Sequence, residues 1–284
     1  MSAPVSAILP TWKRLDDLPK TLRRLKTCTP PPSEIIVHID AGDDETGAWL
    51  AEHHPDVRIL KSTERQGPGG GRNRLLNAVS QPFAASFDDD SYPIDDDYFD
   101  RLLDAFDRHS DAGMLSSVVV HRGETTPPAE PRSEEVADFI GCGCSYRMAA
   151  WQHVHGYLPR AVAYGIEEID MGLQMIDVGW SIVHDYRLRV FHDTDLEHRI
   201  HPEKTAGAIE NRALLAYVRY PISYMWMGIL QYLRRILWSL RSGRADGVLQ
   251  GILHTPSTLR AYSDFRNPVN PATLRKALRL RSRT

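Results

Sequence analysis

Residues 81–93 read QPFAASFDDDSYP, and this stretch decides the fold class. A short apolar run, 83–87, is followed at once by three aspartates, Asp88, Asp89 and Asp90. The run predicts a buried strand. Three adjacent carboxylates repel one another, so their place at a strand end needs a reason. A divalent cation supplies one, because Mg²⁺ binds proteins through one or two carboxylates together with substrate phosphates. A solvated acidic turn is the alternative.

Strand and helix patterns alternate on both sides of this stretch. Leucines spaced by three and four residues over 15–25 predict an amphipathic helix. The remaining patterns predict strands at 5–11, 33–40, 57–62, 112–121 and 181–193, helices at 44–54, 96–109 and 166–180, and a polar loop at 123–135. Residues 141–151 begin with a glycine-rich segment and are expected to continue as a helix. Strands that alternate with helices predict an α/β fold with a mostly parallel sheet.

Polar side chains end three of the predicted strands. Thr11 ends the first strand, Asp40 the second and Asp88 the fourth. Ligands of open parallel sheets bind outside the carboxyl ends of the strands, so these residues should meet at one site. Alternate side chains of an extended segment point the same way. We therefore expect Asp88 and Asp90 to face the ligand, and Asp89 to face the scaffold or assist a nucleotide.

A second triplet, Asp95–Asp97, looks like the first but has different surroundings. It precedes a predicted helix, and a helix dipole favours acidic residues at its start. We expect this triplet to hold no ligand.

The segment GPGGGRNR at 67–74 is glycine-rich and is expected to form a loop that runs into a helix. Glycines allow close backbone approach to a phosphate, and a helix start offers free N–H groups. The spacing fits neither a P-loop nor a dinucleotide fingerprint, which would follow the first strand. A flexible turn without a ligand is the alternative.

Four segments, taken together and in order, resemble the GT-A glycosyltransferases of family 2. They are VSAILPTWKRLDDLPKTLRRL, EIIVHIDAGDDET, GPGGGRNRLLNAVSQPFAASFDDDSYP and YGIEEIDMGLQMIDVGW, and the resemblance covers roughly residues 4–195. The resemblance implies a GT-A, Rossmann-like fold: a mixed, mostly parallel sheet flanked by helices. It also implies a metal-dependent, inverting glycosyltransferase that uses a nucleotide diphosphate sugar. The implied acceptor is a hydroxyl of a glycan, a lipid-linked compound or a small molecule.

The resemblance implies roles for single residues on the donor side. Thr11 and Asp40 match contacts to the base and ribose, and Arg72 matches a nucleotide-side position. In the aspartate motif, Asp90 would hold Mg²⁺ or Mn²⁺ and Asp88 the sugar or ribose hydroxyls, with Asp88 also a candidate metal ligand. The segment GCGCSYR at 141–147 matches the stretch beneath the donor sugar and acceptor.

His192 falls where some members of that family supply a third metal ligand. A strand-end histidine without a metal is the alternative. His198 and His201 lie just beyond and are secondary candidates.

The segment IEEID at 166–170 matches the family motif that carries the catalytic base. The matching position is Glu168, where the family has Asp, so Glu167, Glu168 and Asp170 all stay candidates. A carboxylate there would accept the acceptor hydroxyl's proton as the oxygen attacks the sugar. Ordinary acids in the first turn of a helix are the alternative.

The composition of the 284 residues is that of a soluble globular protein, with 42% hydrophobic and 25% charged residues. No secretory signal pattern opens the chain. The cysteines, Cys28, Cys142 and Cys144, have neither disulfide-framework nor zinc spacing. A reducing, cytoplasmic location is the simplest prediction.

Charge divides the chain into two predicted regions, a catalytic domain at 1–208 and a basic, mostly helical region at 209–284. Residues 212–284 carry 13 Lys+Arg and 2 Asp+Glu, whereas the preceding residues carry 21 and 35. The 14 residues 220–233 are free of charge, but a spanning helix needs ~20 apolar residues. The basic region therefore either packs on the catalytic domain or attaches peripherally to an anionic membrane, on its inner face. A nucleic-acid partner is not expected, because no binding motif accompanies the charge.

Two other functions are compatible with an acidic α/β site. A nucleotidyltransferase also joins this fold to metal-binding carboxylates, but its glycine loop usually follows the first strand. A non-catalytic module that binds nucleotide sugars or a membrane surface is the other.

Overall fold

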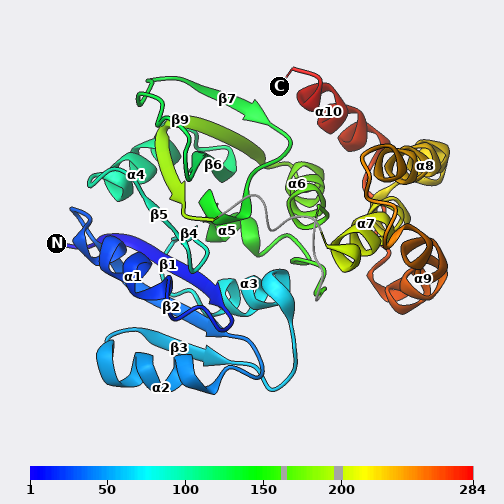
Figure 1. Ribbon diagram of the computed structural model, residues 1–284. Coiled ribbons are helices and arrows are strands. Elements are labelled where there is room, and N and C mark those ends of the chain that lie inside the picture. Colours follow the sequence, from blue (N-terminus) through cyan, green and yellow to red (C-terminus); the bar gives the residue numbers. More distant parts are fainter. Residues whose placement is uncertain (161–164, 195–200, 284) are drawn as a thin grey trace.

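The structure, a computed structural model, describes residues 1–160, 165–194 and 201–283 (Figure 1). The strands are β1 (Ala3–Thr11), β2 (Pro32–Ile39), β3 (Arg58–Lys61), β4 (Phe83–Ser86), β5 (Ser91–Pro93), β6 (Ala112–His121), β7 (Ser133–Val136), β8 (Cys144–Arg147) and β9 (Ser181–His192). The helices are α1 (Leu18–Thr27), α2 (Asp44–His53), α3 (Gly67–Ala78), α4 (Tyr98–Arg108), α5 (Met148–Trp151), α6 (Glu167–Asp177), α7 (Pro202–Arg219), α8 (Met225–Arg241), α9 (Val248–Ala261) and α10 (Pro271–Arg281).

The strands form one mixed sheet in the order β3-β2-β1-β4-β8-β6-β9-β5, with β7 also paired to β9. The pairs β1–β2, β1–β4, β2–β3 and β6–β9 are parallel. Strand β8 runs antiparallel between β4 and β6, and β5 and β7 run antiparallel to β9. The predicted fold class, a mixed sheet flanked by helices with a helical appendage, is confirmed.

Helices cover both faces of the sheet, each with its own hydrophobic core (Figure 1). Leu22 of α1 and Phe99 of α4 are buried in the core on one face. Leu75 of α3, Trp151 of α5 and Met171 of α6 are buried in the core on the other. The leucine spacing of α1 produces this burial directly, because residues three and four apart share one side of a helix.

The carboxyl ends of β1, β2 and β4 meet at one edge of the sheet. Thr11 is paired in register with Ile39, the residue before Asp40. Ser86 is paired with Ile8, three residues before Thr11. The polar residues that follow these strands are therefore brought together, as the sequence predicts.

The glycine-rich segment is helical rather than a loop, because α3 begins at Gly67 itself. A side chain at Gly71 would lie 2.7 Å from His38 Nδ1, and one at Gly69 would lie 2.4 Å from the Glu167 carboxylate. The glycines thus let the first turn of α3 approach β2 and the start of α6 closely. The loop prediction was wrong because close packing, rather than flexibility, explains these glycines.

Three short strands were missed in the sequence. Ser91–Pro93 form β5 on β9, residues 133–136 form β7 on β9, inside the segment expected to be a loop, and Cys144–Arg147 form β8 in the middle of the sheet. These strands of three or four residues carry too little pattern to distinguish them from a loop or a helix start. Pairing with distant strands, which only the folded chain provides, decides them.

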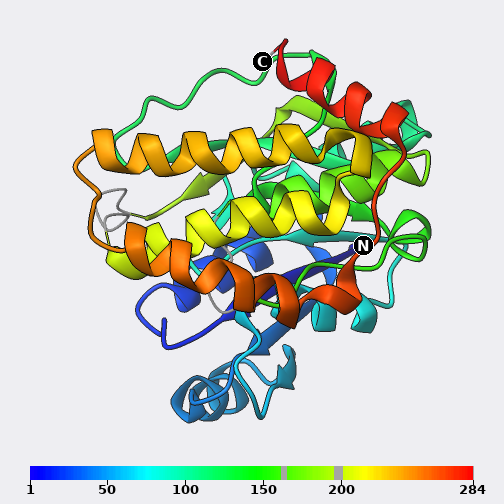
Figure 2. The ribbon, with the colours of Figure 1, turned by 90° about the vertical axis from the view of Figure 1, so that its right-hand side faces the viewer.

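The helical appendage packs on α6 and extends away from the sheet (Figure 1). Leu173 of α6, Leu214 of α7 and Leu274 of α10 share a third core. Helices α8 and α9 both pack on α7 and form the outer layer of the molecule (Figures 1 and 2). The proposed domain boundary at residue 208 lies inside α7. Among the described helices, none has the length and apolarity to cross a membrane.

Candidate active site

A cavity of about 670 Å³ opens at the carboxyl ends of the strands. Its lining includes Thr11, Asp40, Asp88, Asp89, Asp90 and His192, so six predicted site residues meet there. Arg72 lies beneath this group and is buried. Glu167 and Glu168 approach from α6. The third α6 candidate, Asp170, is directed elsewhere, as described below.

Asp40 anchors the start of α3. One carboxylate oxygen accepts hydrogen bonds from the backbone N–H groups of Ala41 and Gln66, both at 2.9 Å. The other accepts the N–H of Gly67 at 3.0 Å and lies 3.3 Å from Nε of Arg65. Free N–H groups at a helix start are satisfied in this way. Asp40 therefore also fixes the cavity wall; its contact to the nucleoside stays a prediction.

Asp89 bridges the aspartate motif to β1. Its carboxylate accepts a hydrogen bond from the Thr11 hydroxyl at 2.9 Å, and its backbone carbonyl accepts one from Thr21 at 2.8 Å. Burial and the neighbouring charges of Asp90 and Asp88 raise the pKa of Asp89 to about 7. The neighbouring carboxylates of the motif therefore repel one another at neutral pH, and a bound cation would relieve this repulsion.

Asp90 connects the motif to the end of β9. Its Oδ1 lies 3.2 Å from Nε2 of His192, and its Oδ2 accepts a hydrogen bond from Arg14 at 2.6 Å. Burial alone would raise the pKa of Asp90, but the contacts with His192 and Arg14 outweigh it and lower the pKa. This carboxylate is thus kept ionised, as a metal ligand must be.

Asp88 is held from below by the buried Arg72. The two side chains form an ion pair, and Arg72 Nε also donates to the Ser86 hydroxyl at 3.2 Å. The other terminal nitrogen of the same guanidinium lies 3.5 Å from the Glu167 carboxylate. Arg72 therefore ties the aspartate motif to the start of α6.

The donor atoms around the motif fit a divalent cation. Within the described part of the chain, ligand atoms of Asp88, Cys142 and His192 lie within 4.8 Å of one another. Asp90 brings a second carboxylate to the opposite nitrogen of His192 and lies outside this three-residue group. Carboxylates and imidazole suit Mg²⁺, Mn²⁺ and similar ions. Cys142, whose sulfur lies 3.5 Å from His192 Nδ1, was not predicted to take part.

Glu167 and Glu168 begin α6 beside Arg72. Glu167 is buried, and this burial, with the charges of Glu168 and Asp88, raises its pKa to about 8 although Arg72 opposes the change. Burial also raises the pKa of Glu168, against hydrogen bonds from backbone N–H groups that include Gly141. The two carboxyl groups therefore differ, since Glu167 is largely protonated at neutral pH.

Asp170 lies on another side of α6. It forms a buried ion pair with Arg219 of α7 and accepts a hydrogen bond from the side-chain amide of Gln174 at 2.9 Å. This arrangement joins the catalytic region to the appendage. The structure thus does not bring Asp170 to the cavity.

Basic and aromatic residues on the cavity wall were missed in the sequence. They are Trp12, Lys13, Arg14, Arg65 and Lys204. The guanidinium of Arg65 stacks on the Trp12 ring, 3.8 Å from its centroid. The residues WKR directly after β1 were the available signal, because they follow a strand end that faces the site.

The remaining sequence candidates lie outside this group. His198 is outside the described residues, and His201 caps α7 through the N–H of Glu203. The second triplet is not merely solvated. Asp95 pairs with Arg189 and Asp96 with Arg24, so these acids join the helices to the sheet.

The sequence model of glycosyl transferase family 2 matches residues 6–160, more than half of the chain. The chain belongs to glycosyl transferase family 2. Membership of this family favours a glycosyltransferase over the two alternatives, a nucleotidyltransferase and a non-catalytic module.

A relative of this chain, an undecaprenyl-phosphate mannosyltransferase from Micrococcus luteus, is 39% identical over 69 residues. The match covers 23% of this chain and 28% of that protein, so this chain spans less than a third of the relative's length in the match.

Two solved structures share the fold of this chain. The mannosyltransferase PcManGT from Pyrobaculum calidifontis, in complex with GDP-Man and Mn²⁺, aligns with a TM-score of 0.60 and 14% identity over 94% of this chain and 83% of its own. S. aureus TarS 1–349 in complex with UDP-GlcNAc aligns with a TM-score of 0.59 and 16% identity over 93% and 80%. These similarities confirm the GT-A fold.

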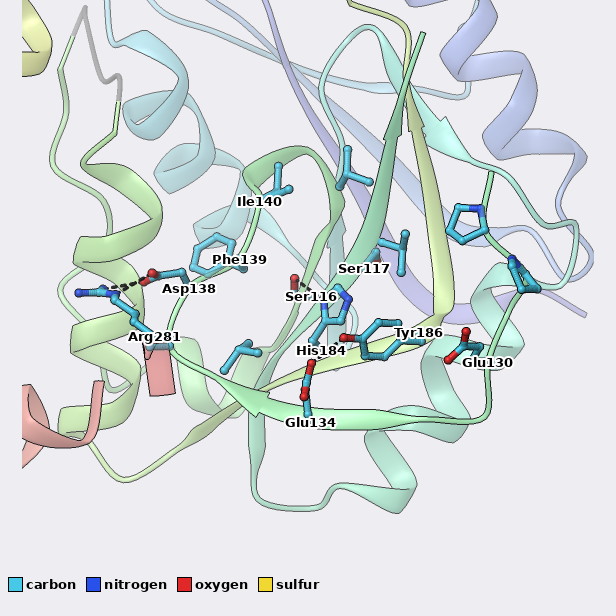
Figure 3. Close-up of a pocket in the computed structure, with 16 residues that line it drawn as sticks. Ser116, Ser117, Glu130, Glu134, Asp138, Phe139, Ile140, His184, Tyr186 and Arg281 are labelled. Carbon is cyan, nitrogen blue, oxygen red and sulfur yellow. Dashed lines mark hydrogen bonds and ion pairs between the residues drawn. The ribbon is translucent and has the colours of Figure 1, made fainter. Parts of the chain in front are cut away.

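A second cavity, of about 500 Å³, lies on β6, β7 and β9 (Figure 3). Its wall is largely apolar, with Phe139 and Ile140 at one end and Tyr186 at the other. The ion pair between Asp138 and Arg281 closes one side. Ile140 directly precedes Gly141, whose N–H bonds the Glu168 carboxylate, so this cavity adjoins the region of α6 that carries the glutamates.

Proposed function

We propose that this glycosyltransferase is metal-dependent and inverting, and that it moves a sugar from a nucleotide diphosphate sugar to an acceptor hydroxyl. One observation carries the proposal: Arg72 contacts both Asp88 of the aspartate motif and Glu167 of the α6 pair. The residues suited to the donor and those suited to the acceptor therefore meet at one place.

Asp88 and His192, whose ligand atoms lie close to that of Cys142, and Asp90, on the other nitrogen of His192, are the residues that would hold Mg²⁺ or Mn²⁺. Such a cation, when bound, neutralises charge that develops on the departing diphosphate. The raised pKa of Asp89 supports this assignment, because a group of uncompensated carboxylates is costly without a counter-charge. Structural similarity to a Mn²⁺ complex of PcManGT agrees with it.

The basic wall of the cavity supports a diphosphate-bearing donor. Lys13, Arg14, Arg65 and Lys204 line the cavity together with the carboxylates. Cationic side chains orient phosphates by charge-assisted hydrogen bonds. Arg14, which already contacts Asp90, would then bridge the donor to the metal site.

Glu168 is the residue we propose as general base. Glu167 holds its proton at neutral pH, and Asp170 is committed to Arg219. Burial raises the pKa of Glu168 toward the working range of a base while leaving the side chain half-buried and within reach of a ligand. Glu167 instead takes no part in the proton transfer, and it positions Arg72.

The acceptor is proposed to be a hydroxyl on a glycan or a lipid-linked compound. A hydroxyl needs a base to take its proton, and Glu168 supplies one. A polyprenyl phosphate, suggested by the Micrococcus luteus relative, is the second candidate. Its attacking oxygen is already ionised, so that acceptor would need no base. The apolar cavity behind Gly141 could receive the part of an acceptor that is not a sugar.

A thermal-shift screen of UDP-, GDP- and dTDP-sugars, each with Mn²⁺ or with a chelator, tests the proposal. Ligands that bind the folded state raise the melting temperature by mass action. A shift for at least one sugar nucleotide that needs Mn²⁺ is expected. Equal shifts with and without the chelator would refute metal dependence.

A further inference from the structure

Helices α8 and α9, in the outer layer of the molecule (Figure 2), both expose apolar side chains. On α8 the exposed fractions are 60% for Trp226, 57% for Ile229, 47% for Leu233, 50% for Leu237 and 50% for Leu240. The spacing of these residues, three or four apart, places them on one side of the helix. Leu249 and Leu253, which are four apart on α9, are 68% and 66% exposed. We name the exposed side chains of these two helices the outer face.

The outer face is cationic as well as apolar. Arg234 and Arg241 are exposed on α8, and α8 contains no acidic residue. Trp238 lies between two arginines, with Arg235 at 4.5 Å and Arg244 at 4.9 Å from its ring centroid. Apolar side chains mixed with tryptophan and arginine are the composition of helices that lie in a membrane interface.

The opposite side of α8 is already packed within the protein. Gly228 is buried, and a side chain there would lie 2.4 Å from the β-carbon of Ala216 on α7. The exposed apolar side chains of α8 are therefore not the ones that pack this helix against the protein. These side chains remain exposed in the folded appendage, and this exposure needs another explanation.

The arginine-rich end of the outer face lies beside the cavity at the carboxyl ends of the strands, which we call the donor cavity. Gly247, just before α9, packs so closely on Pro202 at the start of α7 that a side chain there would lie 2.1 Å from the Pro202 carbonyl. Two residues further along α7, Lys204 lines the donor cavity. The turn that carries Arg244 is thus at the same end of α7 as the catalytic site.

We propose that the outer face docks on an anionic lipid bilayer, with α8 lying in the plane of the interface. A second copy of the chain is the rival occupant, but pairing two outer faces would bring like charges together with no acid on α8 to neutralise them. An anionic headgroup layer offers the opposite charge, and the lipid tails accept the exposed apolar side chains. The proposal does not depend on the sugar or on the transfer mechanism.

Flotation of the full chain with vesicles is the test. The vesicles are pure phosphatidylcholine or phosphatidylcholine with phosphatidylglycerol. The protein is expected to float with the anionic vesicles and to lose binding as salt is raised. Failure to float with anionic vesicles, or equal flotation with neutral ones, would overturn the proposal.

Two double variants identify the surface. Leu233→Gln with Leu237→Gln removes apolar area, and Arg234→Gln with Arg241→Gln removes charge. Each should weaken vesicle binding roughly tenfold or more. Matched controls are Val178→Gln, an exposed apolar residue on another surface, and Arg23→Gln with Arg279→Gln, which removes the same charge elsewhere. Controls that weaken binding as much as the test variants would overturn the assignment.

Two further measurements keep the result interpretable. Donor hydrolysis and melting temperature should be unchanged in all variants, because the substituted residues are exposed and outside the catalytic cavity. Light scattering without lipid should give a monomer. A dimer that the Leu233→Gln with Leu237→Gln variant dissolves would show that a second copy, and not a bilayer, covers the outer face.

Discussion

The guanidinium of Arg72 and the carboxylate of Glu167 lie 3.5 Å apart in the interior, although 95 positions separate them in the sequence. The same guanidinium pairs with Asp88. One buried cation thus sets the distance between the aspartate motif and the start of α6. Because a buried charge is stable only when it is paired, this arrangement is fixed once the core has formed.

Removing the Asp90 carboxylate should weaken metal-dependent donor binding. Asp90→Asn keeps the size of the side chain but removes the charge that His192 and Arg14 hold in the ionised form. We expect calorimetric affinity for the donor with Mn²⁺ to fall about tenfold or more. Asp96→Asn is the control, since Asp96 stands in the similar triplet and its side chain is exposed. Unchanged affinity in Asp90→Asn would remove Asp90 from the metal site.

Glu168→Gln should stop turnover without weakening donor binding. Loss of a general base costs about 10²- to 10⁴-fold in rate, whereas binding of the donor does not use that proton. Glu167→Gln is the matched control, because a glutamine resembles the protonated glutamate that we expect there. Rates should be compared with hydroxyl and with phosphate acceptors. If Glu168→Gln stays active only with a phosphate acceptor, that result would support a polyprenyl phosphate as the acceptor.

The raised pKa of Glu167 predicts a pH-dependent stability. The folded protein keeps this proton up to about pH 8, whereas the unfolded chain releases it near its ordinary pKa of 4.5. The contribution of Glu167 to the free energy of unfolding therefore falls as the pH rises through this window. Glu167→Gln should gain stability relative to wild type over the same window, by on the order of 3 kcal/mol.

Thermal melts across this window measure the effect. Glu52→Gln is the control, because the side chain of Glu52 is exposed on α2. Parallel curves for wild type and Glu167→Gln would mean that Glu167 ionises normally, and the choice between the two glutamates would reopen.

Breaking the pair between Asp170 and Arg219 should lower stability and leave the chemistry intact. Removing one partner of a buried ion pair costs about 3–5 kcal/mol, because the other charge stays buried. Asp170→Asn should therefore lower the melting temperature, with kcat per folded molecule unchanged. Asp170→Leu combined with Arg219→Met should recover part of the loss. A loss of kcat in Asp170→Asn below its melting range would return Asp170 to the list of bases.

The amino-acid sequence determined the elements with strong patterns and the residues that follow their ends. The leucine spacing of α1 and the apolar runs of β1, β2 and β4 are local signals, and they predict where Thr11, Asp40 and Asp88 stand. Local signals failed at β8, and at Gly67, where α3 begins, because pairing with distant strands and close packing decided the outcome.

Only the tertiary structure separated residues that look alike in sequence. Glu167, Glu168 and Asp170 fall within four positions, yet one is buried against Arg72, one is half-buried near Gly141 and one is paired with Arg219. Neighbours along a helix point in different directions, so each meets a different dielectric and a different partner. Charge state and role follow from those surroundings, which are assembled from segments far apart in the chain.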